Sequence, residues 1–93
     1  MFSLHGKVAL VTGAGSGIGQ AIAQLFALQG AFVWVVDRNV AAGEATVAGI
    51  RAANGLAEAI AVDVSDPAAT LALATRIPRV DLLVNNAGIG HVG

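Results

Sequence analysis

The sequence has 93 residues, of which 56% are hydrophobic and 12% are charged. A chain of this length forms one domain at most, and its hydrophobic fraction exceeds the about 45–50% of an average globular protein. Five basic and six acidic residues give a net charge of −1, and no run of either sign occurs. The sequence therefore predicts neither a nucleic-acid-binding surface nor an acidic tail, and a small molecule is the expected partner.

No membrane span is predicted either, although no charged residue occurs between Val8 and Val36. Glycines and glutamines interrupt that segment, whereas a membrane helix needs about 20 predominantly apolar residues. The apolar residues between Lys7 and the first of these glycines are too few for a signal peptide. The absence of cysteine excludes disulfides and thiol catalysis and fits a reducing compartment. We therefore expect a cytoplasmic protein.

The first half of the chain alternates strand and helix patterns. Lys7–Thr12 is apolar after its lysine, as expected of a strand covered on both faces, and Gly17–Gly30 has helical spacing. The apolar stripe of this helix is predicted to consist of Ile18, Ile22, Leu25 and Phe26. Gly30 suits a C-terminal cap. Ala31–Val36 follows as a second buried strand that stops at Asp37.

The second half continues the alternation. Asn39–Asn54 is predicted to be a helix that packs through Val47 and Ile50, and Leu56–Val62 is predicted to be a third strand. Ser65-Asp66-Pro67 indicates the start of a third helix, because it combines a capping side chain with a proline in the first turn. This helix is expected to end at Pro78. Its packing stripe and the strand that follows it are predicted to be Ala69, Leu73 and Ile77, and Val80–Val84.

This order of elements predicts an α/β fold, with a parallel sheet of about four strands flanked by three helices. In such sheets, ligands bind beyond the carboxyl ends of the strands, where the strand order reverses. Thr12, Asp37, Asp63 and Asn85 each close a strand and are therefore expected at that edge.

The glycine-rich segment Thr12–Gly19, T-G-A-G-S-G-I-G, lies between the first strand and the first helix. Gly13 allows a sharp turn out of the strand, and Gly15 and Gly17 present no Cβ to an approaching anion. Gly19 lets the helix lie close to the strand. The helix N-terminus offers unpaired amides to a pyrophosphate. A glycine pattern that only turns the chain is the alternative, but its position between strand and helix favours phosphate binding.

Asp37 is predicted to recognise the ribose of an adenine dinucleotide. It ends the second strand, where a carboxylate can accept hydrogen bonds from both ribose hydroxyls. The same carboxylate would repel the 2′-phosphate of NADP, so NAD is the expected cofactor and NADP is less favoured. Arg38 leaves NADP open, because a guanidinium beside the ribose could hold a phosphate. Alternatively, Asp37 only caps the helix that begins near Asn39.

Four further residues at strand ends have both a binding and a structural interpretation. Asp63 and Val64 could form the wall of an adenine pocket, with the carboxylate accepting from the exocyclic amine, or Asp63 could simply face water. Asn85 and Asn86 could tie loops together through their amides, or they could be ordinary turn residues. No metal-ligand cluster and no nucleophile–base pair is recognisable in the sequence.

Together these motifs resemble the amino-terminal half of a short-chain dehydrogenase/reductase. The resemblance covers essentially the whole chain and rests on Thr12–Gly19, Asp37, Asp63-Val64 and N-N-A-G at Asn85–Gly88. It implies a Rossmann-type fold and an NAD-dependent oxidoreductase that transfers hydride between the nicotinamide and a secondary alcohol or ketone. The predicted cofactor-binding residues are Gly13, Ser16, Gly17, Ile18, Gly19, Asp37, Arg38, Asp63, Val64, Asn86, Ala87 and Gly88.

The resemblance also implies a role for each part of this set. The residues of the glycine-rich turn would contact the phosphates and the adenosine ribose, and Asp37 would bind the ribose hydroxyls. Asp63 and Val64 would contact the adenine, and Asn86–Gly88 would pass near the nicotinamide ribose. Thr12 and Asn85 would be mainly structural.

The sequence departs from the family in lacking its catalytic residues. The family's chemistry rests on a Y-x-x-x-K pair with a serine and an asparagine, all after N-N-A-G, whereas this sequence has no tyrosine and its one lysine is Lys7. No catalytic residue is therefore predicted, and the chain alone is expected to be inactive. We interpret residues 1–93 as an incomplete Rossmann half-domain, a fragment of an enzyme that acts on a small-molecule substrate and is a homo-oligomer when complete.

Two other interpretations remain. The chain could be a non-catalytic dinucleotide-binding module, whereas a methyltransferase with an adenosyl cofactor is disfavoured by the glycine-rich and N-N-A-G motifs. If the chain is a fragment, its fourth strand is expected to be an unpaired apolar edge.

Overall fold

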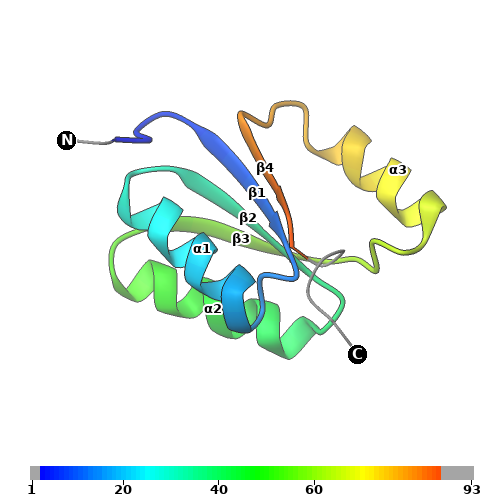
Figure 1. Ribbon diagram of the computed structural model, residues 1–93, viewed down its shortest axis with the longest axis horizontal. Helices are drawn as coiled ribbons and strands as arrows, with labels where there is room; N and C mark the ends of the chain where they lie inside the picture. The colour runs from blue at the N-terminus through cyan, green and yellow to red at the C-terminus, as the bar shows by residue number, and fades with distance from the viewer. Residues whose placement is uncertain (1–2, 87–93) are drawn as a thin grey trace.

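Within residues 3–86, which the computed structural model describes, four parallel strands form a sheet in the order β3-β2-β1-β4 (Figure 1). The strands are β1 (Val8–Thr12), β2 (Phe32–Asp37), β3 (Leu56–Ala61) and β4 (Leu82–Asn85). The helices are α1 (Gly17–Leu28), α2 (Val40–Ala52) and α3 (Pro67–Arg76). The predicted α/β fold class is confirmed, and every predicted element is present in its predicted order.

The strand order reverses beside β1. The chain runs outward from β1 to β2 and β3, and then crosses back to β4 on the other side of β1. Because parallel crossovers are right-handed, the two outward connections and the returning connection lie on opposite faces of the sheet. Figure 1 shows α1 and α2 on one face and α3 on the other. The order therefore reverses between β1 and β4. The carboxyl ends of these two strands, with that of β2 next to β1, lie where such sheets bind ligands.

The face beneath α1 and α2 holds the larger part of the core. Val11, Val33 and Val35 are buried there against Val47 and Ile50 of α2. The prediction that α2 packs through Val47 and Ile50 is confirmed. Because the strands at the centre of this sheet are covered on both faces, their sequences are apolar throughout instead of alternating.

The predicted packing stripe of α1 is only partly correct. Ile22 and Phe26 pack against the core, but Ile18 is 70% exposed and Leu25 is 53% exposed. The buried face of α1 consists of Gly19, Ala23 and Ala27. These small residues recur every four positions and let the helix backbone approach the sheet closely, which pushes the larger side chains to the flanks.

The starts of α2 and α3 follow the sequence signals. Asn39 caps α2, with its side chain accepting a hydrogen bond from the Ala42 amide at 3.0 Å. Asp66 caps α3 in the same way, with its Oδ1 accepting from the Ala68 amide at 3.0 Å, and Pro67 occupies the first turn. Both caps satisfy backbone donors that the helix itself cannot pair.

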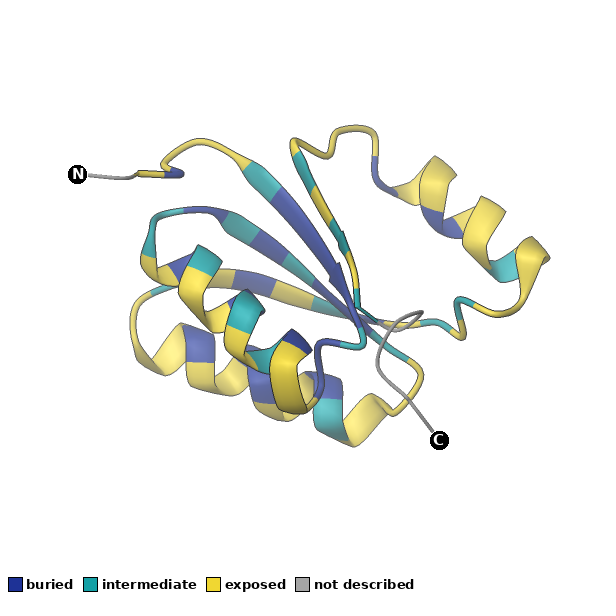
Figure 2. Cartoon of the chain, viewed as in Figure 1, coloured by how far each residue is buried: buried dark blue, intermediate teal, exposed yellow. Residues whose placement is uncertain are grey.

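The face beneath α3 is less completely covered (Figure 2). Of the predicted stripe of the third helix, Leu73 and Ile77 are buried against Leu10, Val36 and Ile60, whereas Ala69 is only half-buried. Between α3 and strands β1 and β4 lies a mostly apolar groove of about 590 Å³. Leu83 of β4 lines this groove and is 68% exposed. The prediction of an apolar edge is confirmed for the described residues, among which β4 pairs with β1 alone.

At the amino-terminal ends of the strands, exposed polar contacts join the start of β4 to the start of β1. Asp81 Oδ2 accepts from the Val8 amide at 2.8 Å, and the Asp81 amide donates to the Val8 carbonyl at 2.8 Å. Arg79 donates to the Gly6 carbonyl at 3.0 Å and pairs with Asp81 at 2.9 Å. Residues 78–81 thus form a connection, and β4 begins at Leu82, two residues later than predicted.

None of the helices within residues 3–86 is long and apolar enough to cross a membrane.

Candidate functional site

The glycine-rich turn leads from β1 into α1, as predicted. Gly13 has a φ of 63°, in the left-handed region that favours glycine, and this allows the sharp exit from β1. Ser16 is the N-cap of α1 in extended conformation, and its side chain makes no capping hydrogen bond. The first turn of α1 therefore lacks a side-chain cap of the kind that begins α2 and α3, which leaves its amide end suited to an anion.

Gly19 brings α1 into contact with the turn. A Cβ at this position would collide with the Gly13 carbonyl and would lie 2.6 Å from Asn86 Nδ2. Asn86 Nδ2 in turn donates to the Gly13 carbonyl oxygen at 3.3 Å. Asn86 therefore ties the end of β4 to the turn after β1, which agrees with the interpretation that the asparagine amides join loops. Ala87 and Gly88 lie outside the described residues.

Asn85 and Thr12 join β4 to β1 at the same edge. Thr12 is buried, and its hydroxyl donates to Asn85 Oδ1 at 3.1 Å, with the Val84 carbonyl at 3.4 Å as a second acceptor. This geometry supports the structural roles expected for Thr12 and Asn85. Together with Asn86, these contacts hold the carboxyl ends of the two strands in register.

Asp37 at the end of β2 is partly buried, and both of its carboxylate oxygens accept backbone hydrogen bonds. Oδ2 accepts from the Gly15 amide and Oδ1 accepts from the Asn39 amide, each at 2.9 Å. Asn39, not Asp37, is the N-cap of α2, so the interpretation of Asp37 as that cap is wrong. The carboxylate instead links the glycine-rich turn to the β2–α2 connection.

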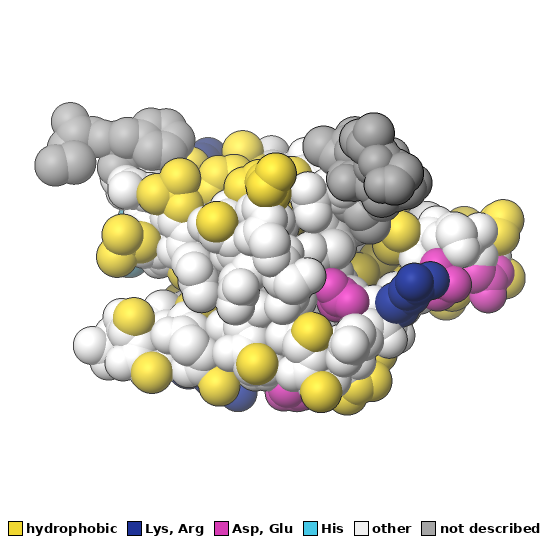
Figure 3. Space-filling model, turned by 60° about the horizontal axis from the view of Figure 1, so that its bottom comes forward, with side chains coloured by type: hydrophobic (Ala, Val, Ile, Leu, Met, Phe, Trp, Pro, Cys, Tyr) yellow, Lys and Arg dark blue, Asp and Glu magenta, His cyan; other side chains and the backbone are white. Residues whose placement is uncertain are grey.

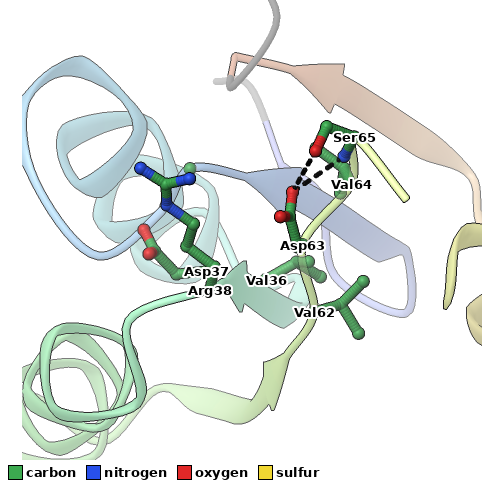
Figure 4. Close-up of a pocket in the computed structure, with 8 residues that line it drawn as sticks. Val36, Asp37, Arg38, Val62, Asp63, Val64 and Ser65 are labelled. Atoms are coloured by element: carbon green, nitrogen blue, oxygen red, sulfur yellow. Dashed lines mark hydrogen bonds between the residues drawn. The ribbon is translucent and has the colours of Figure 1, made fainter.

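A pocket of about 450 Å³ opens beside Asp37 (Figure 4). Val36, Val62 and Val64 supply its apolar surface, and Asp37 and Arg38 lie across it from Asp63. Its size and its mixture of apolar and charged groups fit an adenosine. Asp37, Arg38, Asp63 and Val64, which sequence reasoning placed at the adenosine, all line this one pocket together with Gly13.

Asp63 is exposed and bonds to its own loop. Its Oδ1 accepts from the Ser65 hydroxyl at 2.6 Å and from the Ser65 amide at 2.9 Å. These hydrogen bonds, together with the charge of Arg38, hold the pKa of Asp63 below its usual value of 3.8. Asp63 is therefore ionised at neutral pH, and its carboxylate can accept a hydrogen bond from an amino group at the mouth of the pocket.

Charged groups are sparse elsewhere on this side of the molecule. Figure 3 shows acidic and basic side chains next to one another on one face, among largely uncharged and hydrophobic surface. Arg38 is exposed and forms no ion pair within residues 3–86. Its guanidinium is thus available at the pocket. The part of the chain that the structure describes contains no group of acidic or histidine side chains arranged to hold a metal ion.

Thr46 is one residue of this region that sequence reasoning missed. Its side chain is fully buried, and its hydroxyl donates to the Ala14 carbonyl in the turn at 3.0 Å. The Ala14 amide donates to the Val36 carbonyl at 3.2 Å. The position of Thr46 as a lone threonine among alanines, glycines and valines on the packing side of α2 could have indicated its contact with the turn. A hydroxyl that is buried there needs a hydrogen-bond partner.

Comparisons with known proteins agree with this geometry. The model of the short chain dehydrogenase family matches residues 7–93. The chain belongs to this family of oxidoreductases. It is 45% identical over 95 residues to D-threitol dehydrogenase of Mycolicibacterium smegmatis, a match that covers 98% of this chain and 36% of the relative.

Solved structures of the family share the fold. A metagenomic short-chain oxidoreductase in complex with NADP superposes with a TM-score of 0.88 at 45% identity, covering 96% of this chain and 42% of that one. A 7α-hydroxysteroid dehydrogenase complexed with NADH superposes with a TM-score of 0.84 at 40% identity, covering 90% of this chain and 34% of the other. The chain thus spans about a third of the length of the curated relatives it matches.

Proposed function

We propose that this chain is the NAD(H)-binding part of an oxidoreductase that transfers hydride between the nicotinamide and a secondary alcohol or ketone. The observation that carries the proposal is the convergence of the glycine-rich turn, Asp37 and the adenosine-sized pocket at the carboxyl ends of the strands, next to the point between β1 and β4 where the strand order reverses. The dehydrogenase relatives support the reaction class.

Each part of the site has a proposed role. Gly13, Ser16, Gly17, Ile18 and Gly19 would present the turn and the amide end of α1 to the pyrophosphate and the neighbouring ribose. Asp37 would bind the adenosine ribose hydroxyls, because each of its oxygens keeps a second lone pair besides its backbone bond. Asp63 and Val64 would contact the adenine. Asn86, Ala87 and Gly88 would pass near the nicotinamide ribose.

NAD is the proposed cofactor in preference to NADP. A 2′-phosphate about 4 Å from Asp37 would cost about 1 kcal/mol in water and about 4 kcal/mol at an effective dielectric constant of 20. That range corresponds to a preference of about fivefold to about a thousandfold. The free guanidinium of Arg38 opposes this effect, and the solved relatives include complexes with NADH and with NADP. The proposal therefore rests on the charge of Asp37.

The 93-residue chain alone is proposed to be inactive. It contains no tyrosine, and its lysine, Lys7, is exposed just before β1, at the far end of the sheet from the pocket. A proton donor for the carbonyl that receives the hydride would have to come from elsewhere in the complete protein. We also place the protein in the cytoplasm, a proposal that the lack of cysteine supports.

The proposal can be tested on the complete protein with NAD and a panel of secondary alcohols, including polyols and hydroxysteroids. We expect oxidation of an alcohol to its ketone, with release of a proton and one NADH formed per turnover, measured by absorbance at 340 nm. NADH binding without turnover of any alcohol or ketone would favour the non-catalytic module. A natural protein of only 9.2 kDa by mass spectrometry would point the same way.

A further inference from the structure

Asp37 connects two loops that are distant from each other in the sequence. Its Oδ2 accepts from the Gly15 amide in the glycine-rich turn, and its Oδ1 accepts from the Asn39 amide at the start of α2. We propose that Asp37 is a positioning residue for the phosphate-binding turn, in addition to its proposed contact with the ribose. This inference rests on the proposed cofactor-binding function.

The packing of Gly15 shows how closely the turn rests on this connection. Gly15 is buried, and a Cβ at this position would lie 2.7 Å from the Ala42 Cβ and 2.8 Å from Asp37 Oδ2. The absence of a Cβ therefore serves contact with Asp37 and α2, whether or not a ligand is bound. The amide of Gly15 can reach the carboxylate only because no side chain separates them.

The other contacts that hold the turn act before Gly15, at Gly13 through Asn86 and at Ala14. Ala14 is fixed through both its amide and its carbonyl, by Val36 and Thr46. The bond to Asp37 extends this attachment to Gly15, immediately before Ser16, the N-cap of α1. Loss of this bond would release the segment that orients the first amides of α1, where the pyrophosphate is proposed to bind.

The two roles of Asp37 are compatible because an ionised carboxylate offers about four acceptor sites and the backbone uses two of them. Replacing Asp37 to admit NADP would remove the repulsion of the 2′-phosphate, but it would also detach the turn. We therefore expect such a substitution to shift the NADP-to-NAD preference while weakening the binding of both cofactors.

The test uses ligands without ribose hydroxyls, so that the direct contact with Asp37 cannot contribute. The dissociation constants of 2′,3′-dideoxyadenosine and of its 5′-diphosphate are measured by calorimetry on the complete protein. The readout is the dissociation constant of the diphosphate divided by that of the nucleoside, so a higher ratio means weaker binding of the diphosphate group. In Asp37→Ala we expect this ratio to rise about 3- to 10-fold, the effect of losing one hydrogen bond of ordinary strength. If Asp37 acted only through its charge, the ratio would fall, because the substitution removes a negative charge near the diphosphate.

Two further variants separate positioning from charge. Asp63→Ala removes the same charge from the same pocket but leaves Gly15 attached, so the ratio should not rise. Gly15→Ala keeps the carboxylate but separates the turn from it, so the ratio should rise as in Asp37→Ala. Gly15→Ala also keeps the inference testable if Asp37→Ala does not fold, which circular dichroism would reveal.

The outcomes distinguish this inference from the function on which it rests. A ratio that rises in Asp37→Ala and Gly15→Ala, but not in Asp63→Ala, supports the positioning role. Wild-type protein that binds both ligands, with a ratio unchanged or lowered in Asp37→Ala and Gly15→Ala, overturns the positioning role and leaves the proposed function intact. Wild-type protein that binds neither these ligands nor NADH overturns both.

Discussion

The two faces of the sheet are held together in different ways. Beneath α1 and α2, valines of the strands are buried against Val47 and Ile50 of α2 and the small residues of α1, and a polar side chain, Thr46, is buried with its hydrogen bond satisfied. Beneath α3, a groove of about 590 Å³ remains, and Leu83 is largely exposed. The start of β4 is joined to β1 by exposed contacts of Asp81 and Arg79. Burial thus stabilises the face beneath α1 and α2, whereas the face beneath α3 is partly open and the start of β4 is joined to β1 by polar contacts.

The largest expected effect is on the free energy of unfolding when one isoleucine on each face is replaced by alanine. Ile50 beneath α2 is 3% exposed, and Ile77 after α3 is 6% exposed and borders the groove. We expect Ile50→Ala to lower the free energy of unfolding by about 3 kcal/mol and Ile77→Ala by about 1–2 kcal/mol, since the groove already leaves part of Ile77 without neighbours. Urea denaturation of the complete protein measures both. Equal losses would contradict the comparison.

A second prediction concerns the approach of α1 to the turn. A Cβ at Gly19 would meet the Gly13 carbonyl, so Gly19→Ala must displace the helix or the turn. We expect a loss of about 1–3 kcal/mol in the free energy of unfolding, as for other overpacked sites, together with weaker NADH binding. Gly49→Ala in α2 is the matched control, because the nearest atom there is the end of Gln24 at 3.9 Å. Comparable losses in the two variants would refute the close-approach argument.

A third prediction concerns the uncovered face and edge. We expect the isolated 93-residue chain to self-associate through β4 and the groove, because an unpaired apolar edge strand favours pairing. Leu83→Glu should reduce this association and change the free energy of unfolding by less than about 0.5 kcal/mol, as usual for an exposed side chain. Light scattering measures the association. A monodisperse monomer for the wild-type chain would contradict the expectation that the groove and the edge of β4 cause self-association.

The smallest expected effect is a pH dependence at the start of β4. The hydrogen bond from the Val8 amide, followed by the contact with Arg79, lowers the pKa of Asp81 from its usual value of 3.8. A lowered folded-state pKa means that the carboxylate stabilises the fold above that usual value and that this contribution is lost as the pH falls below it. The chemical shift of the Val8 amide should therefore titrate below pH of about 4. Asp81→Asn should abolish the titration, and an unchanged titration in that variant would exclude Asp81 as its source.

The sequence predicted the architecture well because strand and helix patterns with glycine and capping residues between them are local signals. Asp66-Pro67 marked the start of α3, and the polar residues that end strands indicated the edge where the pocket lies. It did not predict which face of α1 would be buried, because Ile18 and Leu25 are more apolar than Gly19, Ala23 and Ala27. Close packing of two backbones overrode hydrophobicity there.

The sequence also did not predict which groups Asp37 and Thr46 contact. Both side chains bond to the backbone of the glycine-rich turn, across 22 residues for Asp37 and 32 for Thr46. Nearly every residue type offers the same backbone donor and acceptor, so the sequence does not show which backbone group a side chain will bind. Sequence reasoning could therefore identify Asp37 as a ligand-facing carboxylate while missing that it also holds the turn.

Asp37 and the glycine-rich turn are proposed to form a dinucleotide site that prefers NAD. The most direct measurement is a fluorescence titration of the complete protein with NADH and with NADPH. Its control is Glu44→Ala, which removes an exposed acidic side chain from α2. We predict that NADH binds at least about fivefold more tightly in the wild type and in Glu44→Ala, and that this preference shrinks in Asp37→Ala. Equal affinities for NADH and NADPH in the wild type would contradict the claim.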